Sequence, residues 1–129
     1  MKDAKIKGTE IDAINGHLTA TTKDPLEIEN WTKALERKGK EFPIINSLKS
    51  MTGHCLAAAG AIESVATVLQ LKHQFIFPNI NCNEVHPDIL KLISKEKIPT
   101  KMIPKKLNII AKASFGFGDV NGCIIFKKY

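Results

Sequence analysis

The chain has 129 residues, of which 43% are hydrophobic, and its formal net charge is +6 at pH 7. This length fits one globular domain, or a piece of one, and is too short for two. No run of about eighteen apolar residues occurs and the N-terminus is polar, which argues against a membrane-spanning helix and a signal peptide, so we expect a cytoplasmic protein.

The cysteines and histidines show no spacing typical of a disulfide framework or a metal site. Cys55, Cys82 and Cys123 are odd in number and widely separated, so we expect free thiols that are buried or inert. No metal site is expected. The lysines are dispersed, as on a solvated surface, although attraction to an acidic partner stays open. We expect neither nucleic acid nor a membrane as partner.

The first predicted elements are a strand and a helix. Residues 11–15 form a short apolar run that breaks at Gly16 and predicts a strand. Asp24 as N-cap, with Pro25 at the first helical position and Glu27 at the third, predicts a helix that ends near residue 38.

Strand and helix are then repeated. Residues 42–46 predict a second strand, and residues 55–72 predict a helix whose first half is apolar and made of small residues. A helix of this composition is usually buried. Its polar residues, Glu63, Thr67 and Gln70, lie on one stripe. We therefore expect a buried Ala-rich helix.

The C-terminal part predicts an extended segment at residues 75–81, a short helix near residues 88–94, and a final strand pair. Residues 107–114 and 122–127 are β-rich and flank a glycine-bearing loop, which favours an antiparallel pair. Strands that alternate with helices predict a layered α/β fold, in which sites form at the carboxyl ends of strands.

Two histidines lie at such positions. His17 directly follows the first strand, and His54 stands at the start of the second helix. The positive end of a helix disfavours imidazolium, so a neutral ring there is able to donate an N–H to a developing oxyanion. In the alternative, His54 only caps the helix and His17 binds backbone. Because both histidines occupy the same type of position, we favour the oxyanion role for them.

Lys49 and Glu63 form a second candidate pair. If the helix is buried, Glu63 needs a cationic partner, because an unpaired buried charge is very costly. The alternative places Glu63 on an exposed stripe and Lys49 in solvent, and spacing alone does not decide between them. Likewise, Phe115 and Phe117 in the glycine-bearing loop either line an apolar tunnel or belong to the core.

Residues 49–54 (Lys-Ser-Met-Thr-Gly-His) and 56–63 resemble the Lys-Ser-x-x-Gly-His and Ala-Ala-Gly-x-x-Glu signature of elongating β-ketoacyl-[acyl carrier protein] synthases. Residues 15–21 are similar to the Asn-Ala-His-Gly-Thr-Ser-Thr block of that family. Residues 114–118, with 121–122, are similar to its Asn-Ser-Phe-Gly-Phe-Gly-Gly-Thr-Asn-Gly loop. The resemblance covers nearly the whole chain.

The resemblance implies a thiolase-like fold with a layered mixed sheet, of which residues 1–129 would be the incomplete C-terminal part. The nucleophilic cysteine would come from the absent N-terminal half. The parent would be a homodimeric acyltransferase of fatty acid or polyketide-like biosynthesis, without a cofactor other than the phosphopantetheine of an acyl carrier protein. The fragment alone is expected to be inactive and to self-associate.

The resemblance also implies roles for single residues. His17 and His54 would donate hydrogen bonds to the malonyl thioester carbonyl, with Lys49 as a supporting charge paired with Glu63. The substrate-binding residues would be Thr19, Thr21, Phe115 and Phe117, the threonines on the phosphopantetheine arm and Phe117 as a gate. The family pattern is altered at Leu18, Ala20, Ala113, Asp119 and Val120. A non-catalytic partner subunit that sets chain length is the alternative, and retention of both histidines favours the enzyme.

Overall fold

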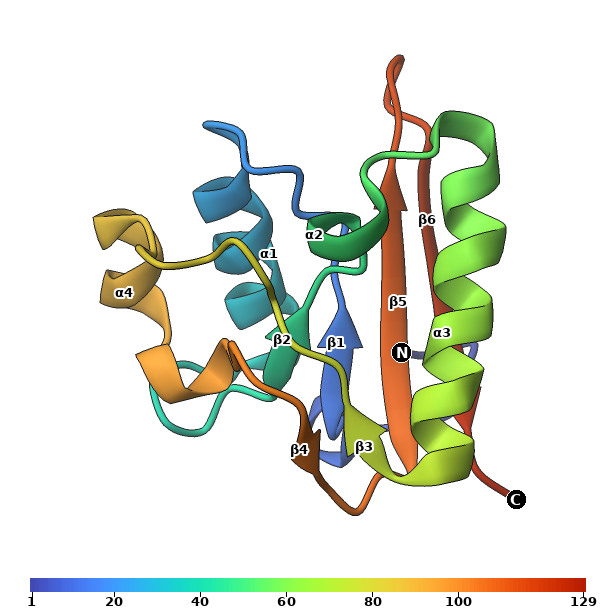
Figure 1. Cartoon of the computed structure of the whole chain (residues 1–129). Helices are drawn as coiled ribbons and strands as arrows, with labels where there is room; N and C mark the ends of the chain where they lie inside the picture. Colours follow the sequence, from blue (N-terminus) through green and yellow to red (C-terminus); the bar gives the residue numbers. More distant parts are fainter.

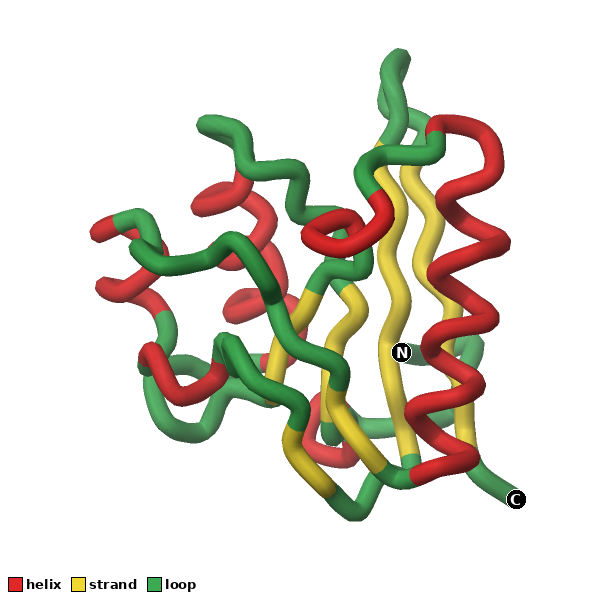
Figure 2. The backbone as a smooth tube through the Cα atoms, viewed as in Figure 1, coloured by secondary structure: helices red, strands yellow, loops and turns green.

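The computed structural model describes all 129 residues, which fold around a mixed four-stranded sheet with helices on both faces (Figures 1 and 2). The strand order is β2 (Ile44–Asn46), β1 (Ala13–Asn15), β5 (Ile109–Phe115), β6 (Asn121–Lys127). Strand β1 is parallel to β2 and β5, whereas β6 is antiparallel to β5. The predicted layered mixed sheet and C-terminal strand pair are confirmed.

Helices α1 (Asp24–Leu35) and α4 (Pro87–Leu92) cover one face of the sheet (Figure 1). The larger apolar core lies there, and buried members of it include Ile14, Ile28, Phe42, Ile89 and Ala111. Helix α1 ends before the predicted residue 38, because Glu36 adopts a left-handed φ of 55°. The predicted N-cap was wrong: Asp24 is the first helical residue, and Lys23 holds the cap position without a side-chain bond.

Helix α3 (Ala59–His73) covers the opposite face, beside β5 and β6 (Figure 1). A smaller apolar core fills one end of this layer, with Ala13, Ile44, Leu71, Ile76, Leu107 and Ile110. A two-stranded sheet of β3 (Phe75–Ile76) and β4 (Ile103–Pro104) follows the helix. The helix begins at Ala59 and not at the predicted residue 55, because Leu56–Ala58 form a 3₁₀ turn.

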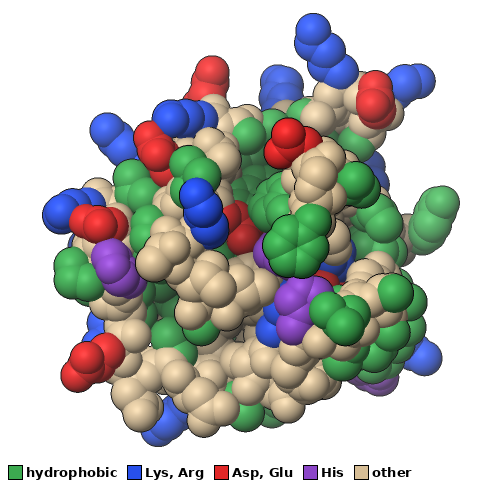
Figure 3. Space-filling model, turned by 90° about the horizontal axis from the view of Figure 1, so that it is seen from above, with side chains coloured by type: hydrophobic (Ala, Val, Ile, Leu, Met, Phe, Trp, Pro, Cys, Tyr) green, Lys and Arg blue, Asp and Glu red, His purple; other side chains and the backbone are tan.

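The polar stripe of α3 faces the sheet. Glu63, Thr67 and Gln70 are at most 2% exposed, whereas Val65 and Val68 on the opposite side are 61% and 46% exposed. The Ala-rich helix is therefore buried on one face only in this chain, and hydrophobic side chains gather on its outer face (Figure 3). The alternative that placed Glu63 on an exposed stripe was wrong.

The remaining elements are short. They are the 3₁₀ turns η1 (Gly8–Glu10), η2 (Leu56–Ala58) and η3 (Lys95–Lys97), and the single-turn helix α2 (Lys49–Thr52). None of the helices is both long enough and apolar enough to cross a membrane. Since β1, β2 and β5 are mutually parallel, the loops that follow them emerge at one edge of the sheet. The segments that carry His17, His54 and Phe115 lie at this edge.

Candidate active site

The two histidines meet at the carboxyl edge of the sheet. The ring centroids of His17 and His54 are 5.4 Å apart, with the planes inclined by 79°. Phe115, at the end of β5, places its ring edge-on to His17 at 5.8 Å. Seen from this edge, histidine side chains lie among hydrophobic ones (Figure 3). Segments far apart in the sequence thus build one site.

His54 lies in the loop between α2 and η2, and not at the start of the long helix as the sequence predicted. The loop can turn there because Gly53 ends α2 with a φ of 72°, a conformation that favours glycine. The backbone N–H of Leu56 donates to His54 Nδ1 over 3.1 Å. Because Nδ1 is an acceptor, a neutral His54 carries its proton on Nε2, which is free to donate.

The backbone of His17 is held by a buried carboxylate of α1. Glu27 accepts hydrogen bonds from the N–H groups of His17 at 2.9 Å and Leu18 at 2.8 Å, and from Trp31 Nε1 at 3.3 Å. A Cβ at Gly16 would lie 2.9 Å from Glu27 Oε1, so the absence of a side chain there allows this close approach. Sequence reasoning treated Glu27 only as part of a helix start and missed this role.

A second carboxylate of α1 holds the loop that carries the threonines. Asp24 accepts hydrogen bonds from the N–H groups of Thr19, Ala20 and Thr21. The hydroxyl oxygens of Thr19 and Thr21 are 3.2 Å apart at the surface of this loop. The two threonines therefore form one small hydroxyl pair beside His17. Their position suits the binding of a polar chain that enters at the sheet edge.

A buried ion cluster lies beneath the histidines. Lys49 of α2 pairs with Glu63 Oε1 of α3, and both side chains are at most 6% exposed. Lys112 of β5 pairs with Glu63 Oε2 at 2.5 Å and is 2% exposed. The pairing of Lys49 with Glu63, left open by the sequence, is therefore present. Lys112 was missed, although a lone lysine inside a β-rich run was a readable signal.

The electrostatic surroundings keep His17 neutral. Burial lowers the pKa of His17, and the positive charges of Lys49 and Lys112, with that of His54 when its ring is protonated, lower it further, against an opposing effect of Glu63. A neutral imidazole keeps one N–H donor and one acceptor. In this state the ring can stabilise a developing oxyanion by donating a hydrogen bond, without transferring its proton.

The two phenylalanines of the final loop differ in position. Phe115 is 38% exposed and contacts His17, whereas the side chain of Phe117 is fully exposed at the hairpin tip. The tip turns through Gly118 and Asp119, both with positive φ, and Gly116 N–H donates to Val120 O over 2.8 Å. In this chain, Phe115 alone of the two lies at the histidine site.

The thiols lie outside the site. Cys55 and Cys82 are partly buried; Cys123 is exposed as a residue, although its thiol is partly desolvated. All three are free thiols, as expected. Burial raises the pKa of Cys82 and of Cys123, which keeps them in the less reactive thiol form. No group of three or more His, Cys, Asp or Glu side chains is placed to hold a metal ion.

A mixed α/β sheet with paired histidines at its strand ends, above a buried lysine and glutamate, agrees with the thiolase-like class of condensing-enzyme folds that the sequence resembles. The family described as "Beta-ketoacyl synthase, C-terminal domain" matches residues 1–83, and the chain belongs to this family. The sequence resemblance is thereby confirmed.

Curated relatives agree. The 3-oxoacyl-[acyl-carrier-protein] synthase 2 of Vibrio harveyi is 36% identical over an alignment of 129 residues, which covers 99% of this chain and 30% of the relative. The 3-oxoacyl-[acyl-carrier-protein] synthase 1 of Buchnera aphidicola subsp. Baizongia pistaciae is 42% identical over 122 residues, with 92% of this chain and 28% of the relative covered. The chain thus spans less than a third of the length of these relatives.

Solved structures show the same fold. A type II polyketide synthase acyl-carrier protein in complex with its ketosynthase matches with a TM-score of 0.85 and 34% identity, over 99% of this chain and 30% of that chain. The ishigamide ketosynthase/chain length factor matches with a TM-score of 0.88 and 29% identity, over 99% and 30%. The predicted C-terminal part of a thiolase-like fold is confirmed.

Proposed function

We propose that this chain forms part of an acyltransferase, a β-ketoacyl-[acyl carrier protein] synthase that joins a malonyl unit to an acyl chain held on a cysteine. In this proposal residues 1–129 are the C-terminal part, and the remainder of the protein supplies the cysteine. The observation that carries the proposal is the meeting of His17 and His54 at 5.4 Å above the buried pair of Lys49 and Glu63.

The geometry supports a separate role for each residue of the site. Loss of CO₂ from the malonyl thioester leaves an enolate, whose negative charge rests on the thioester oxygen. Nε2–H of His54 and the N–H of neutral His17 donate to that oxygen. The enolate carbon then attacks the acyl thioester carbonyl, a carbon–carbon bond forms, and the cysteine sulfur leaves as thiolate. Lys49 supplies a fixed positive charge close to His17.

Partners and substrates follow from the same site. The hydroxyl pair of Thr19 and Thr21 would bind the phosphopantetheine arm of an acyl carrier protein, and Phe115 would contact the acyl chain beside His17. No other cofactor is needed for this chemistry. We further propose a cytoplasmic homodimeric parent enzyme of fatty acid or polyketide-like biosynthesis.

The second candidate function is that of a non-catalytic partner subunit of the same fold, which sets the chain length of the product. A silent subunit has no need for two adjacent imidazole donors, nor for a buried charge beneath them. The histidine geometry therefore favours the enzyme.

The test separates two partial reactions of the whole protein. Loss of one oxyanion donor typically costs about a hundredfold to a thousandfold in rate. His54→Ala should lower malonyl decarboxylation by that factor and leave acyl transfer to the cysteine largely intact. His73→Ala, an exposed histidine at the far end of α3, is the control. Equal loss of both partial reactions in His54→Ala would contradict the proposal.

A further inference from the structure

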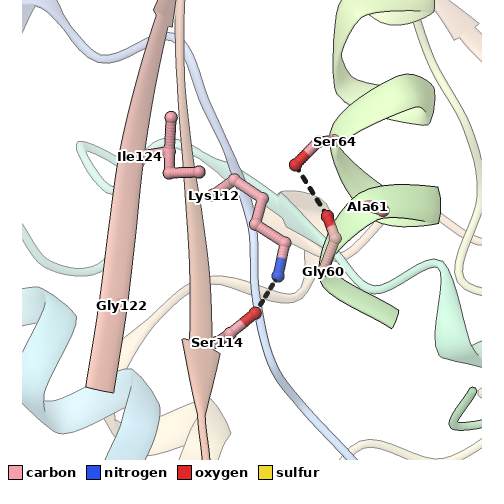
Figure 4. A pocket seen from close by; sticks show the side chains of 7 residues that line it. All are labelled: Gly60, Ala61, Ser64, Lys112, Ser114, Gly122 and Ile124. Carbon is pink, nitrogen blue, oxygen red and sulfur yellow. Dashed lines mark hydrogen bonds between the residues drawn. The ribbon is translucent and has the colours of Figure 1, made fainter. Parts of the chain in front are cut away.

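Lys112 is a charged residue in the middle of a buried strand. Its side chain is 2% exposed and faces α3 from the centre of β5. The ammonium contacts Glu63 Oε2 at 2.5 Å and the backbone oxygen of Ala113 at 2.7 Å. It also donates a hydrogen bond to Ser114 Oγ (Figure 4). The ammonium is therefore held by two hydrogen bonds within β5, to Ala113 O and Ser114 Oγ, and by an ion pair with Glu63 Oε2.

The charges in this cluster do not cancel. Glu63 is the one carboxylate that contacts both Lys49 and Lys112, one on each oxygen. Burial of an unbalanced charge is costly, and an apolar residue at position 112 would avoid that cost. A cavity of about 310 Å³ beside the Lys112 stem, lined by Gly60, Ala61, Ile124 and small polar residues, leaves room for a bulky apolar side chain (Figure 4). Packing alone therefore does not explain a lysine here.

We propose that Lys112 is a positioning residue of the site: its ammonium binds one oxygen of Glu63, so that the other oxygen fixes Lys49 and the buried cluster keeps one net positive charge beneath the paired histidines. Glu63 Oε2 accepts no hydrogen bond, so without the ion pair with Lys112 it would be a buried carboxylate oxygen with no counter-charge. The Glu63 carboxylate would then be free to turn, and the place of Lys49 would be less defined.

The surplus charge acts on His17. The charged or titratable groups around this residue come from every neighbouring element: Lys49 from α2, His54 from the following loop, Glu63 from α3, Lys112 from β5, and Glu27 from α1 at its backbone N–H. The positive charge of Lys112 disfavours the imidazolium form of His17. The same positive charge would favour an enolate at the histidines, a benefit that rests on the function proposed above.

The experiment is a titration of the His17 imidazole by NMR in the 129-residue chain, which needs no catalysis. Lys112→Met removes the charge and keeps a long apolar stem, whereas Lys112→Arg keeps the charge. We expect the midpoint of His17 to shift upward in Lys112→Met, because one repulsive charge is lost, and to stay near the wild-type value in Lys112→Arg. The distant His86 is the internal reference in each sample.

An unchanged His17 midpoint in a folded Lys112→Met variant would overturn the proposal, whatever happens to stability. If that variant does not fold, the wild-type chain provides the second measurement. In a ¹⁵N-labelled sample the NH₃⁺ signals of both Lys49 and Lys112 should persist against exchange with water at neutral pH, because a carboxylate holds each ammonium. A signal for Lys49 without one for Lys112 would overturn the proposal. Neither result depends on whether the whole protein condenses malonyl units.

Discussion

The backbone N–H of Leu56 donates to Nδ1 of His54 over 3.1 Å, and this bond fixes which nitrogen of the ring can act. A neutral imidazole has one N–H, and the nitrogen that accepts a hydrogen bond cannot carry it. The proton of His54 is thus directed to Nε2. The turn that η2 makes before α3 therefore orients the donor, and helix α3 itself does not.

The first prediction concerns this tautomer. At a pH where its ring is neutral, His54 should be almost entirely in the Nε2–H form, because the opposite form would set two N–H groups against each other. Long-range ¹H–¹⁵N correlation spectra distinguish the two ring nitrogens. His73 at the exposed end of α3 provides the comparison. A mixture of tautomers in His54 equal to that in His73 would show that the Leu56 bond does not direct the ring.

The second prediction concerns the buried ion cluster. Glu63→Gln leaves the ammoniums of Lys49 and Lys112 buried without a counter-charge, and breaking a buried pair in this way costs about 3–5 kcal/mol. Urea unfolding measures the loss. Glu29→Gln is the matched control, because the pair of Glu29 with Lys33 is exposed and such pairs contribute about 1 kcal/mol or less. Similar losses in both variants would mean that the cluster is open to water.

The third prediction concerns the carboxylate that holds the His17 loop. Burial raises the pKa of Glu27 above its usual value near 4.5, although three hydrogen bonds oppose the shift. The folded chain therefore binds this proton more tightly than the unfolded chain, and stability falls as the pH rises through the folded pKa. Glu27→Gln cannot titrate. The free energy of unfolding of the wild type, relative to that of the variant, should therefore decrease as the pH rises from 4.5 through the folded pKa of Glu27.

A local measurement completes this test. The amide of Gln offers one oxygen acceptor, so either His17 N–H or Leu18 N–H loses its partner in Glu27→Gln. Hydrogen exchange of the amide that loses its partner should become faster, while that of Thr19, whose N–H donates to Asp24, should change less. A constant stability difference across the pH range would show that Glu27 does not titrate as proposed.

The sequence predicted the position of the site better than its interior. A residue directly after a parallel strand lies at the carboxyl edge of the sheet in any layered α/β fold, so His17 and the loop of His54 were placed together correctly. Lys112 was overlooked because strand periodicity says only that a residue faces one side. It does not say what that side contacts, and the partner, Glu63, comes from a different element.

Helix α3 shows a second limit. Its composition predicted a buried helix, yet composition does not tell which face meets the sheet of its own chain. The sheet offers Asn15 and Lys112 at this level, so the polar stripe of α3 turns inward, and Asn15 donates to Thr67 Oγ1 over 3.0 Å. Val65, Val68 and Leu69 turn outward instead. Such an inversion depends on contacts between elements that a single helical pattern does not record.

The fourth prediction concerns the carrier. The chain has a net charge of +6, and complementary charge raises the rate of encounter with an acidic partner. In the whole protein, the apparent KM for an acyl carrier protein substrate should rise as salt is added, because screening weakens this attraction. An uncharged short thioester substrate serves as the control and should show little change. If both substrates responded alike, charge would not steer the carrier.

The last prediction concerns the outer face of α3. Val65, Val68 and Leu69 are 61%, 46% and 43% exposed, and continuous apolar surface of this kind is rare on monomers. The 129-residue chain should therefore sediment as species larger than a monomer. Val65→Lys combined with Val68→Glu should restore the monomer and leave folding intact, since neither side chain contributes to the core. The control variant Leu26→Lys, at a position 48% exposed on α1, should leave the chain associated. A monomeric wild-type chain, or equal dissociation by the α1 substitution, would show that α3 is not the associating face.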